Sequence, residues 1–202
     1  MSRPTLSIII PLYNEEEIIA EEVTKIVKSM RSMLPERSYE LLLVENGSTD
    51  STVEKCALLE KRFKYVRFFQ IPIASYGLAL KKGMIESNGD SIVLFNIDLW
   101  DITFIDQSLS LIEKESYDIV VGSKTMRGAH DQRPFIRRVI TRIFNAILQG
   151  LLGFVGTDTH GIKIFRRDII IPLVHQCVTD KEIFDSELIL RAQHAGLKKK
   201  EI

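Results

Sequence analysis

Cysteine, long apolar runs and an excess of either charge are all scarce in this sequence. The 202 residues include two cysteines, and 27 basic residues balance 27 acidic ones. A net charge of zero leaves no electrostatic footprint for nucleic acid, so we expect no nucleic-acid partner. No apolar run reaches the roughly 18 residues that a membrane-spanning helix requires. The longest candidate, 143–155, is interrupted by Asn145, Gln149, Gly150 and Gly153.

The cysteines and the two ends of the chain bear on location. Cys56 and Cys177 fall far apart on predicted helices. We expect both to be buried thiols in a reducing compartment, which favours the cytoplasm. Residues 1–5 lead directly into an apolar strand, so no signal peptide is expected. Residues 198–202 resemble the start of a strand with nothing after it, and we expect the natural chain to continue past Ile202.

Apolar runs of strand length alternate with stretches of helical periodicity. Strands are predicted at 6–11, 39–44, 66–71, 92–95 and 117–122. The first helix is predicted to begin at an Asn14–Glu17 capping box and to end at Pro35. A helix at 76–87 is predicted to end at an Asn88–Gly89 stop. Further helices are predicted at 49–63, 104–115, 135–152, 168–174 and 185–195. The basic stretch 124–138 is typical of a mobile loop. This order predicts a single α/β domain over 1–202, a mostly parallel sheet with helices on both faces.

Polar side chains directly follow two of these strands. The first strand ends in Pro11-Leu-Tyr-Asn-Glu15, and the second in Glu45-Asn-Gly-Ser-Thr-Asp50. The carboxyl ends of parallel strands share one rim of an open α/β sheet, where such sheets bind ligands. A strand end plus a helix cap would also account for the first motif, and a plain turn for the second.

Two further motifs follow in the second half of the chain. Asn96-Ile97-Asp98 comes after the strand at 92–95, and Asp158-Thr-His-Gly-Ile-Lys163 precedes Phe184-Asp-Ser-Glu187. In this order the four blocks resemble those of family 2 glycosyltransferases, in particular the branch of polyprenyl-phosphate and dolichyl-phosphate sugar synthases. The resemblance covers nearly the whole chain and implies a GT-A-type fold.

The resemblance also implies a function and a nucleotide site. Such enzymes move a sugar from a nucleotide-diphosphate donor to an acceptor by one displacement with inversion. A polyprenyl phosphate at the cytoplasmic membrane face is the candidate acceptor here. The positions that match the family's nucleotide contacts are Pro11, Tyr13, Glu15, Glu45 and Asn46. Glu45 stands where the family has an aspartate, and its extra methylene moves the carboxylate by about one bond length.

The third block departs from the family pattern. That pattern is Asp-x-Asp, which holds Mg²⁺ or Mn²⁺ against the donor diphosphate, and here it reads Asn96-Ile97-Asp98. Asparagine offers one neutral carbonyl oxygen in place of a carboxylate, so a metal held by Asp98 and Asn96 should bind more weakly. One alternative stays open: Asp98 only caps the next segment, and Asp101 serves as a substitute acid.

Asp158 and Asp185 are the candidate catalytic residues, because they match acidic positions on the acceptor side of the family site. Lys163 and Arg127 are placed to balance phosphate charge. A phosphate acceptor is already ionised at pH 7 and needs little help from a base. Asp185 also fits an ordinary dipole-stabilising acid at a helix start. The arginine-rich stretch 133–152 fits either a helix on a membrane surface or a core-packing helix with a solvated basic face.

Other functions are open. Glu45 and Asn96 together fit a family member that has lost transfer activity and serves as a nucleotide-sugar-binding or interaction module. Whether Asp101 reaches the position of the missing carboxylate discriminates between these readings. A nucleotidyltransferase is less consistent with the sequence, because no glycine-rich phosphate loop follows the first strand. The motifs leave the sugar, the base, the acceptor and the oligomeric state open.

Overall fold

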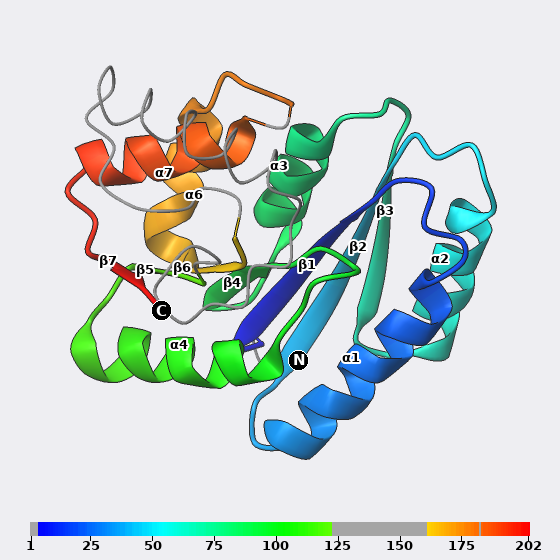
Figure 1. Cartoon of the computed structure of the whole chain (residues 1–202), viewed down its shortest axis with the longest axis horizontal. Helices are drawn as coiled ribbons and strands as arrows, with labels where there is room; N and C mark the ends of the chain where they lie inside the picture. The colour runs from blue at the N-terminus through cyan, green and yellow to red at the C-terminus, as the bar shows by residue number, and fades with distance from the viewer. Residues whose placement is uncertain (1–3, 123–160, 182) are drawn as a thin grey trace, which may run out of the picture.

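The chain folds around one seven-stranded sheet, seen in a computed structural model that describes residues 4–122, 161–181 and 183–202. The strands are β1 (Leu6–Leu12), β2 (Tyr39–Asn46), β3 (Val66–Ile71), β4 (Ser91–Leu94), β5 (Ile119–Val121), β6 (Lys163–Arg166) and β7 (Lys199–Glu201). The helices are α1 (Ile19–Met33), α2 (Thr52–Arg62), α3 (Tyr76–Glu86), α4 (Ile102–Glu115), α6 (Arg167–Gln176) and α7 (Phe184–His194). The predicted alternation of strands and helices is confirmed for these residues (Figure 1).

Most neighbouring strands run parallel, in the order β3-β2-β1-β4-β6-β5-β7. β1 pairs in parallel with β2 and β4, β2 with β3, and β5 with β7, whereas β6 runs antiparallel to β4 and β5. From β1 the chain builds β2 and β3 on one side and then places β4 on the other side. This reversal is a topological switch point, and open α/β sheets bind ligands at the carboxyl ends of the strands beside it.

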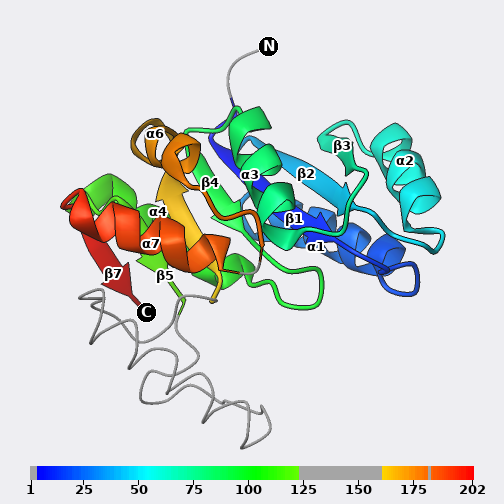
Figure 2. The same cartoon turned by 90° about the horizontal axis from the view of Figure 1, so that it is seen from above.

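Helices cover both faces of the sheet, as predicted. Helices α1, α2 and α4 lie on one face, and α3, α6 and α7 on the other (Figure 1, Figure 2). Each face of the sheet packs against its helices in a hydrophobic core, and alternate side chains of β1 point into these two cores. Ile8 and Ile10 lie in the core with α1, α2 and α4, and Ile9 lies in the core with α3, α6 and α7. Every residue of β1 and β2 is buried. Coverage on both faces explains why residues 8–12 and 41–44 of these central parallel strands are continuously apolar.

The turn after β1 differs from its prediction. Asn14 and Glu17 do not form a capping box, because α1 begins at Ile19 and its N-cap residue, Ile18, makes no side-chain capping hydrogen bond. Asn14 instead adopts a left-handed backbone conformation, with φ of 54°, which a short polar side chain tolerates. Its Oδ1 accepts a hydrogen bond from the Thr49 N–H at 2.8 Å. The side chain therefore ties the β1–α1 turn to the β2–α2 turn.

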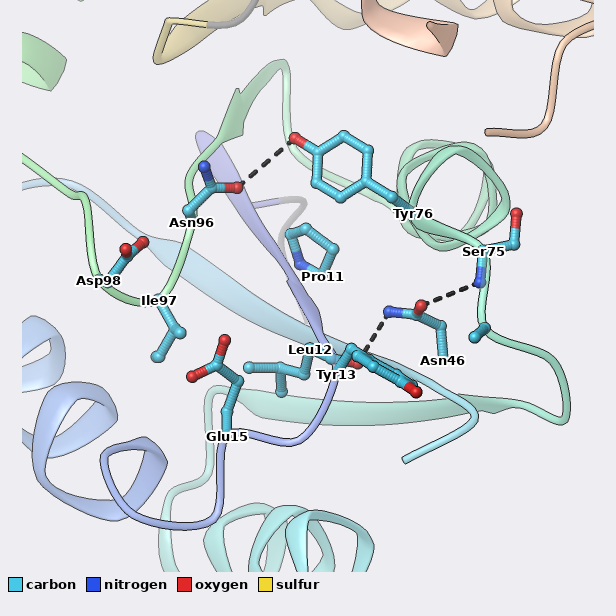
Figure 3. Close-up of a pocket in the computed structure, with 11 residues that line it drawn as sticks. Pro11, Leu12, Tyr13, Glu15, Asn46, Ser75, Tyr76, Asn96, Ile97 and Asp98 are labelled. Atoms are coloured by element: carbon cyan, nitrogen blue, oxygen red, sulfur yellow. Dashed lines mark hydrogen bonds between the residues drawn. The ribbon is translucent and has the colours of Figure 1, made fainter. Parts of the chain in front are cut away.

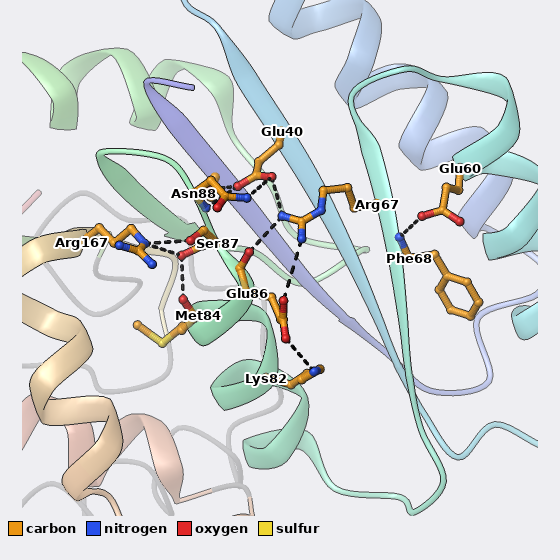
Figure 4. A network of polar contacts seen from close by, with 11 residues as sticks. Glu40, Glu60, Arg67, Phe68, Lys82, Met84, Glu86, Ser87, Asn88 and Arg167 are labelled. Atoms are coloured by element: carbon orange, nitrogen blue, oxygen red, sulfur yellow. Dashed lines mark hydrogen bonds and ion pairs between the residues drawn. The ribbon is translucent and has the colours of Figure 1, made fainter. Parts of the chain in front are cut away.

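A buried carboxylate on β2 fastens the opposite, amino edge of the sheet (Figure 4). Glu40 is 7% exposed and accepts hydrogen bonds from Ser7 Oγ (2.6 Å), the Asn88 N–H (2.6 Å) and Arg67 Nη1 (2.7 Å). Burial alone would raise the pKa of Glu40, but these donors outweigh burial and hold the pKa below its ordinary value of 4.5. The turn from α3 to β4 is thereby joined to β1, β2 and β3.

Gly89 in that turn works differently from the predicted helix stop. Its φ is not in the left-handed region, where the described glycines are Gly47 and Gly196. Its N–H donates to Ser7 Oγ at 2.8 Å, and an added Cβ would lie 2.5 Å from the Ser7 backbone nitrogen. Glycine is needed here because the turn passes so close to β1.

Cys56 and Cys177 are buried free thiols, as predicted. Burial raises the pKa of Cys56 to about 12 and that of Cys177 to about 11, so neither thiol ionises near neutrality. Among the described residues, no helix is both long and apolar enough to cross a bilayer.

Candidate functional site

A cavity of about 330 Å³ opens at the switch point between β1 and β4 (Figure 3). Its walls are the end of β1 with the turn after it, Asn46 at the end of β2, the segment 74–76 at the start of α3, and the segment 96–98 after β4. Each of these segments leaves the carboxyl edge of the sheet or faces it. The cavity therefore occupies the place where this class of sheet binds ligands.

Most residues that the sequence assigns to a donor site meet in this cavity. The predicted nucleotide and metal residues in its lining are Pro11, Tyr13, Glu15, Asn46, Asn96 and Asp98. Tyr13 is 46% exposed, so its ring is accessible beside the cavity. The structure brings these side chains together from three strand ends, and their binding roles stay predictions.

Asn46 links three segments of the cavity wall (Figure 3). Its Nδ2 donates to the Leu12 carbonyl at 2.7 Å, and its Oδ1 accepts from the Ser75 N–H at 3.0 Å. The side chain is buried and both of its polar ends are bonded. Its amide therefore fixes the spacing between the end of β1, the end of β2 and the start of α3.

The loop that carries Glu15 is held against the start of α2. The Glu15 N–H donates to Thr52 Oγ1 at 2.9 Å, and the Glu16 N–H donates to Asp50 Oδ2 at 3.2 Å. Asp50 also accepts from the Thr52 N–H at 3.0 Å. Because residues 49–51 hold this loop, α2 begins at Thr52, later than the predicted start at Thr49.

Two carboxylates give the cavity a negative end. The pKa of Glu15 is raised, first by burial and then by the charges of Asp98 and Asp50. A cation between Glu15 and Asp98 would relieve this repulsion. The chemistry of the cavity is therefore suited to a positively charged guest or to an anion that arrives with one.

The residues at the end of β4 fit a divalent cation that is shared with a ligand. Asp98 supplies a carboxylate and Asn96 an amide oxygen, and both are hard oxygen donors. No group of three or more His, Cys, Asp or Glu side chains forms a ready-made metal site in the part of the chain that the structure describes. A cation here would take its remaining oxygens from a bound diphosphate and water, as Mg²⁺ commonly does.

Asp101 does not replace the missing acid. It is the N-cap of α4, where its Oδ1 accepts from the Thr103 N–H at 2.7 Å, and it is not part of the cavity lining. The capping role considered for Asp98 therefore belongs to Asp101. Asp98 itself is exposed and lines the cavity.

Glu45, predicted to contact the base, lies outside the cavity lining. Its side chain is fully buried, and Oε1 accepts a hydrogen bond from the Ser48 N–H. Oε2 is buried with no hydrogen-bond partner among the described residues. The neighbouring Asn46 faces the cavity, because successive residues of a strand point to opposite sides.

Asp185 and Lys163 form a buried ion pair behind the cavity. Their side chains are 2% and 1% exposed, and Lys163 Nζ lies 3.1 Å from Asp185 Oδ2. Lys163 Nζ also donates to the Gly161 carbonyl at 2.7 Å. The charge of Lys163 is thus committed to Asp185, which differs from its predicted use against a phosphate. Asp158, Arg127 and the stretch 133–152 lie outside the described residues.

Tyr76 belongs to the cavity although the sequence reasoning missed it. Its hydroxyl lies 3.5 Å from both Asn96 Oδ1 and Asp185 Oδ2, so it stands between the cavity and the ion pair. Burial raises the pKa of Tyr76, and Asp185 adds to the effect, so the hydroxyl stays protonated. The available signal was its place at the first turn of the helix predicted at 76–87, directly after the third strand.

Comparison with known proteins identifies the family and the fold of this chain. The family model described as Glycosyl transferase family 2 matches residues 7–173. The chain is 28% identical over 196 residues to the glycosyltransferase AglD of Haloferax volcanii, covering 96% of this chain and 31% of that protein. It is 28% identical over 171 residues to the dolichol-phosphate mannosyltransferase of Pyrococcus furiosus, covering 82% and 47%. The chain therefore spans about a third to a half of the length of these two relatives.

Two solved structures share the fold. A glucosyl-3-phosphoglycerate synthase of Mycobacterium tuberculosis, in complex with Mn²⁺, UDP and phosphoglyceric acid, superposes with a TM-score of 0.69 at 21% identity, over 98% of this chain and 68% of that one. A mannosyltransferase of Pyrobaculum calidifontis, in complex with GDP-Man and Mn²⁺, gives a TM-score of 0.65 at 17% identity, over 100% and 55%. These likenesses confirm the predicted GT-A-type fold. By the match of its sequence over residues 7–173, this chain belongs to glycosyl transferase family 2.

Proposed function

We propose that this chain binds a nucleotide-diphosphate sugar in the switch-point cavity and transfers the glycosyl group to an acceptor. One observation carries the proposal: side chains from the ends of β1, β2 and β4 that match the family's nucleotide and metal positions line a single cavity. The GDP-Man and UDP complexes of the two structural neighbours support it. Tyr13 would bind the nucleotide with Pro11 and Glu15 beside it, and Asn46 would hold the cavity wall around it. Glu45 also matches a nucleotide position of the family, but it lies outside the cavity lining and would not contact the base.

Asp98 and Asn96 would hold a Mg²⁺ or Mn²⁺ ion on the donor diphosphate. When bound, the ion supplies electrostatic stabilisation of the departing nucleoside diphosphate. The protein oxygens then have one role each: Asp98 contributes charge, and Asn96 contributes a neutral ligand. Because one carboxylate has become an amide, we expect weaker metal binding than a pair of aspartates would give.

Transfer would follow a single in-line displacement. The acceptor oxygen forms a bond to the anomeric carbon as the bond from that carbon to the diphosphate oxygen breaks, which inverts the configuration. Asp185 and Asp158 are the proposed acceptor-side residues. A polyprenyl phosphate is the proposed acceptor, supported by the name of the Pyrococcus furiosus relative. The enzyme would then work peripherally at the cytoplasmic face of a membrane, and an ionised phosphate would need no general base.

A second candidate function rests on the same metal position. The amide of Asn96 replaces a carboxylate and Asp101 is used as a helix cap, so the site holds one formal metal carboxylate at the end of β4. A chain with this arrangement would bind a nucleotide sugar without transferring it. The two candidates share the cavity and differ in turnover.

Calorimetric titration of nucleoside diphosphates and their sugars, with Mn²⁺ or with EDTA, tests the proposal. We expect one nucleotide to bind, to bind more tightly with Mn²⁺, and to lose that gain in Asp98→Ala. The matched control, Asp101→Ala, removes an acid three residues away that caps α4, and should cost stability but not binding. Absence of binding by folded protein would refute both candidates. Binding without release of nucleoside diphosphate in the presence of polyprenyl phosphate would favour the inactive module.

A further inference from the structure

The hydroxyl of Tyr76 connects the donor cavity to a buried ion pair. It lies 3.5 Å from Asn96 Oδ1 on the cavity side and 3.5 Å from Asp185 Oδ2 on the buried side. Figure 3 shows its ring beside the cavity with the hydroxyl directed at Asn96. A phenol has one hydrogen, so it donates to one of these two oxygens at a time.

The two oxygens that face this hydrogen differ in their other partners. Lys163 Nζ lies 3.1 Å from Asp185 Oδ2, the same oxygen that faces Tyr76, and both charged side chains are at most 2% exposed. Oδ2 therefore already has a charge-assisted partner. Asn96 Oδ1 has no such partner, and within the described ranges the Tyr76 hydroxyl is the group that bonds the Asn96 side chain.

An asparagine needs this kind of support more than an aspartate would. Its amide carries one oxygen and one NH₂ group, and a half-turn of the terminal torsion exchanges them. A divalent cation can use the oxygen but is repelled by the NH₂ group. A carboxylate presents an oxygen in either orientation, so it needs no outside group to choose between the two.

We propose that Tyr76 is a positioning residue that fixes the Asn96 carbonyl oxygen on the cavity side, where it can meet a cation on a bound diphosphate. The Lys163–Asp185 pair holds the far side of the hydroxyl and leaves its hydrogen for Asn96. This inference rests on the proposed function, because the cation and the diphosphate belong to it. It assigns a task to the altered metal motif: the amide works as a ligand once a neighbouring hydroxyl orients it.

The test compares nucleoside diphosphate binding with and without Mn²⁺ in four proteins: the wild type, Tyr76→Phe, Asn96→Asp and the double variant. The measured quantity is the ratio of the Kd in EDTA to the Kd in saturating Mn²⁺, with UDP and GDP as probes. Outer groups that orient a metal ligand typically change metal affinity by about 10–100-fold. We expect Tyr76→Phe to lower the ratio by about 10-fold and to leave the Kd in EDTA within about twofold.

The second comparison is made in the Asn96→Asp variant, which has a carboxylate at position 96. In the Asn96→Asp background, Tyr76→Phe should change the ratio by less than about twofold, because a carboxylate needs no orientation. Tyr65→Phe is the matched control: Tyr65 is a 40% exposed residue at the amino edge of the sheet, and loss of its hydroxyl should change neither Kd. An unchanged ratio in Tyr76→Phe, or an equal loss in both backgrounds, would overturn the inference.

A separate readout distinguishes failure of this inference from failure of the proposed function. A wild type that binds neither nucleotide contradicts the proposed function. The role of Tyr76 is then read from the Asn96 side-chain NH₂ resonances in ¹⁵N NMR of the metal-free protein, assigned by their loss in Asn96→Asp. Tyr76→Phe should shift these resonances and Tyr65→Phe should not. Resonances that stay in place in Tyr76→Phe would contradict the contact itself.

Discussion

Replacing Glu40 with glutamine should destabilise the fold without touching the cavity. Glu40 lies at the amino edge of the sheet, where one carboxylate joins β1, β3 and the α3–β4 turn (Figure 4). Oε1 accepts from Ser7 Oγ and the Asn88 N–H, and Oε2 accepts from Arg67 Nη1. Each carboxylate oxygen is therefore faced by a donor. In Glu40→Gln, whichever way the amide lies, its NH₂ group meets one of these donors.

The size of this destabilisation depends on the hydrogen bonds that Glu40→Gln loses and on how far water can replace them. A charge-assisted hydrogen bond contributes about 1.5–3 kcal/mol, and a buried donor left unpaired adds a penalty of similar size. The Glu40 side chain is 9% exposed and that of Arg67 is 35% exposed, so water partly compensates the arginine. We expect the free energy of unfolding to fall by about 3 kcal/mol.

Urea denaturation followed by far-ultraviolet circular dichroism at pH 7 measures this change. Glu113→Gln is the matched control, because Glu113 pairs with Arg37 at the surface, with side chains 43% and 31% exposed, and should cost under about 1 kcal/mol. The pKa of Glu40 is lower in the folded protein than its ordinary 4.5, so its contribution is complete above pH 4.5 and is lost as the pH falls through the folded value. Equal losses in the two variants at pH 7 would refute the reasoning.

Three further predictions test other contacts. Asn46→Ala removes both hydrogen bonds that space the cavity wall, and should weaken nucleotide binding at least about tenfold by calorimetry, whereas unchanged affinity would place the nucleotide elsewhere. Burial alone would raise the pKa of Glu187, but hydrogen-bond donors from Thr179, Val178 and Arg191 lower it to about 2. The wild type should therefore be more stable than Glu187→Gln above pH 4.5, and this difference in stability should vanish as the pH falls toward 2. A stability difference that does not depend on pH in urea titrations would contradict this. Gly89→Ala should cost about 1–3 kcal/mol because of the contact with the Ser7 backbone, and a neutral effect in thermal denaturation would count against that close approach.

The architecture could be predicted from sequence because its signals are local. Fully buried parallel strands read as continuous apolar runs, and residues 8–12 of β1 and 41–44 of β2 do so. Element ends were less predictable where a side chain serves a distant segment. Asn14 looked like a helix cap, but its Oδ1 bonds Thr49, which lies 35 residues away, and this contact depends on how two turns meet.

The candidate site was likewise predictable from sequence only in part. Residues at strand ends, such as Asn46 and Asp98, could be placed on the rim from their position after an apolar run, because parallel strands end at one edge. Tyr76 could not, since its role comes from contacts of its hydroxyl with Asn96 and Asp185, which lie 20 and 109 residues away in the chain. The burial of Glu45 was equally hidden, because the sequence does not show toward which side of the sheet a strand-end residue points.

Two buried carboxylates near the cavity favour a ligand-binding site over an interaction module that binds no nucleotide sugar. Glu45 Oε2 and Asp185 Oδ1 are buried without a hydrogen-bond partner among the described residues. An unsatisfied buried acceptor costs about 1–3 kcal/mol, and more when it is charged. An interaction module could gain stability by replacing Glu45 with an apolar residue of similar size, or by replacing Asp185 and Lys163 together, since loss of Asp185 alone would leave the buried Lys163 without its ion pair. Glu45 is next to Asn46 in the chain, and the other carboxylate oxygen of Asp185, Oδ2, faces Tyr76, so each of these carboxylates neighbours a residue of the cavity wall. The destabilisation caused by these unsatisfied oxygens is understandable if the two carboxylates serve the binding of a donor or an acceptor. In a chain that binds neither ligand, the same destabilisation would have no function.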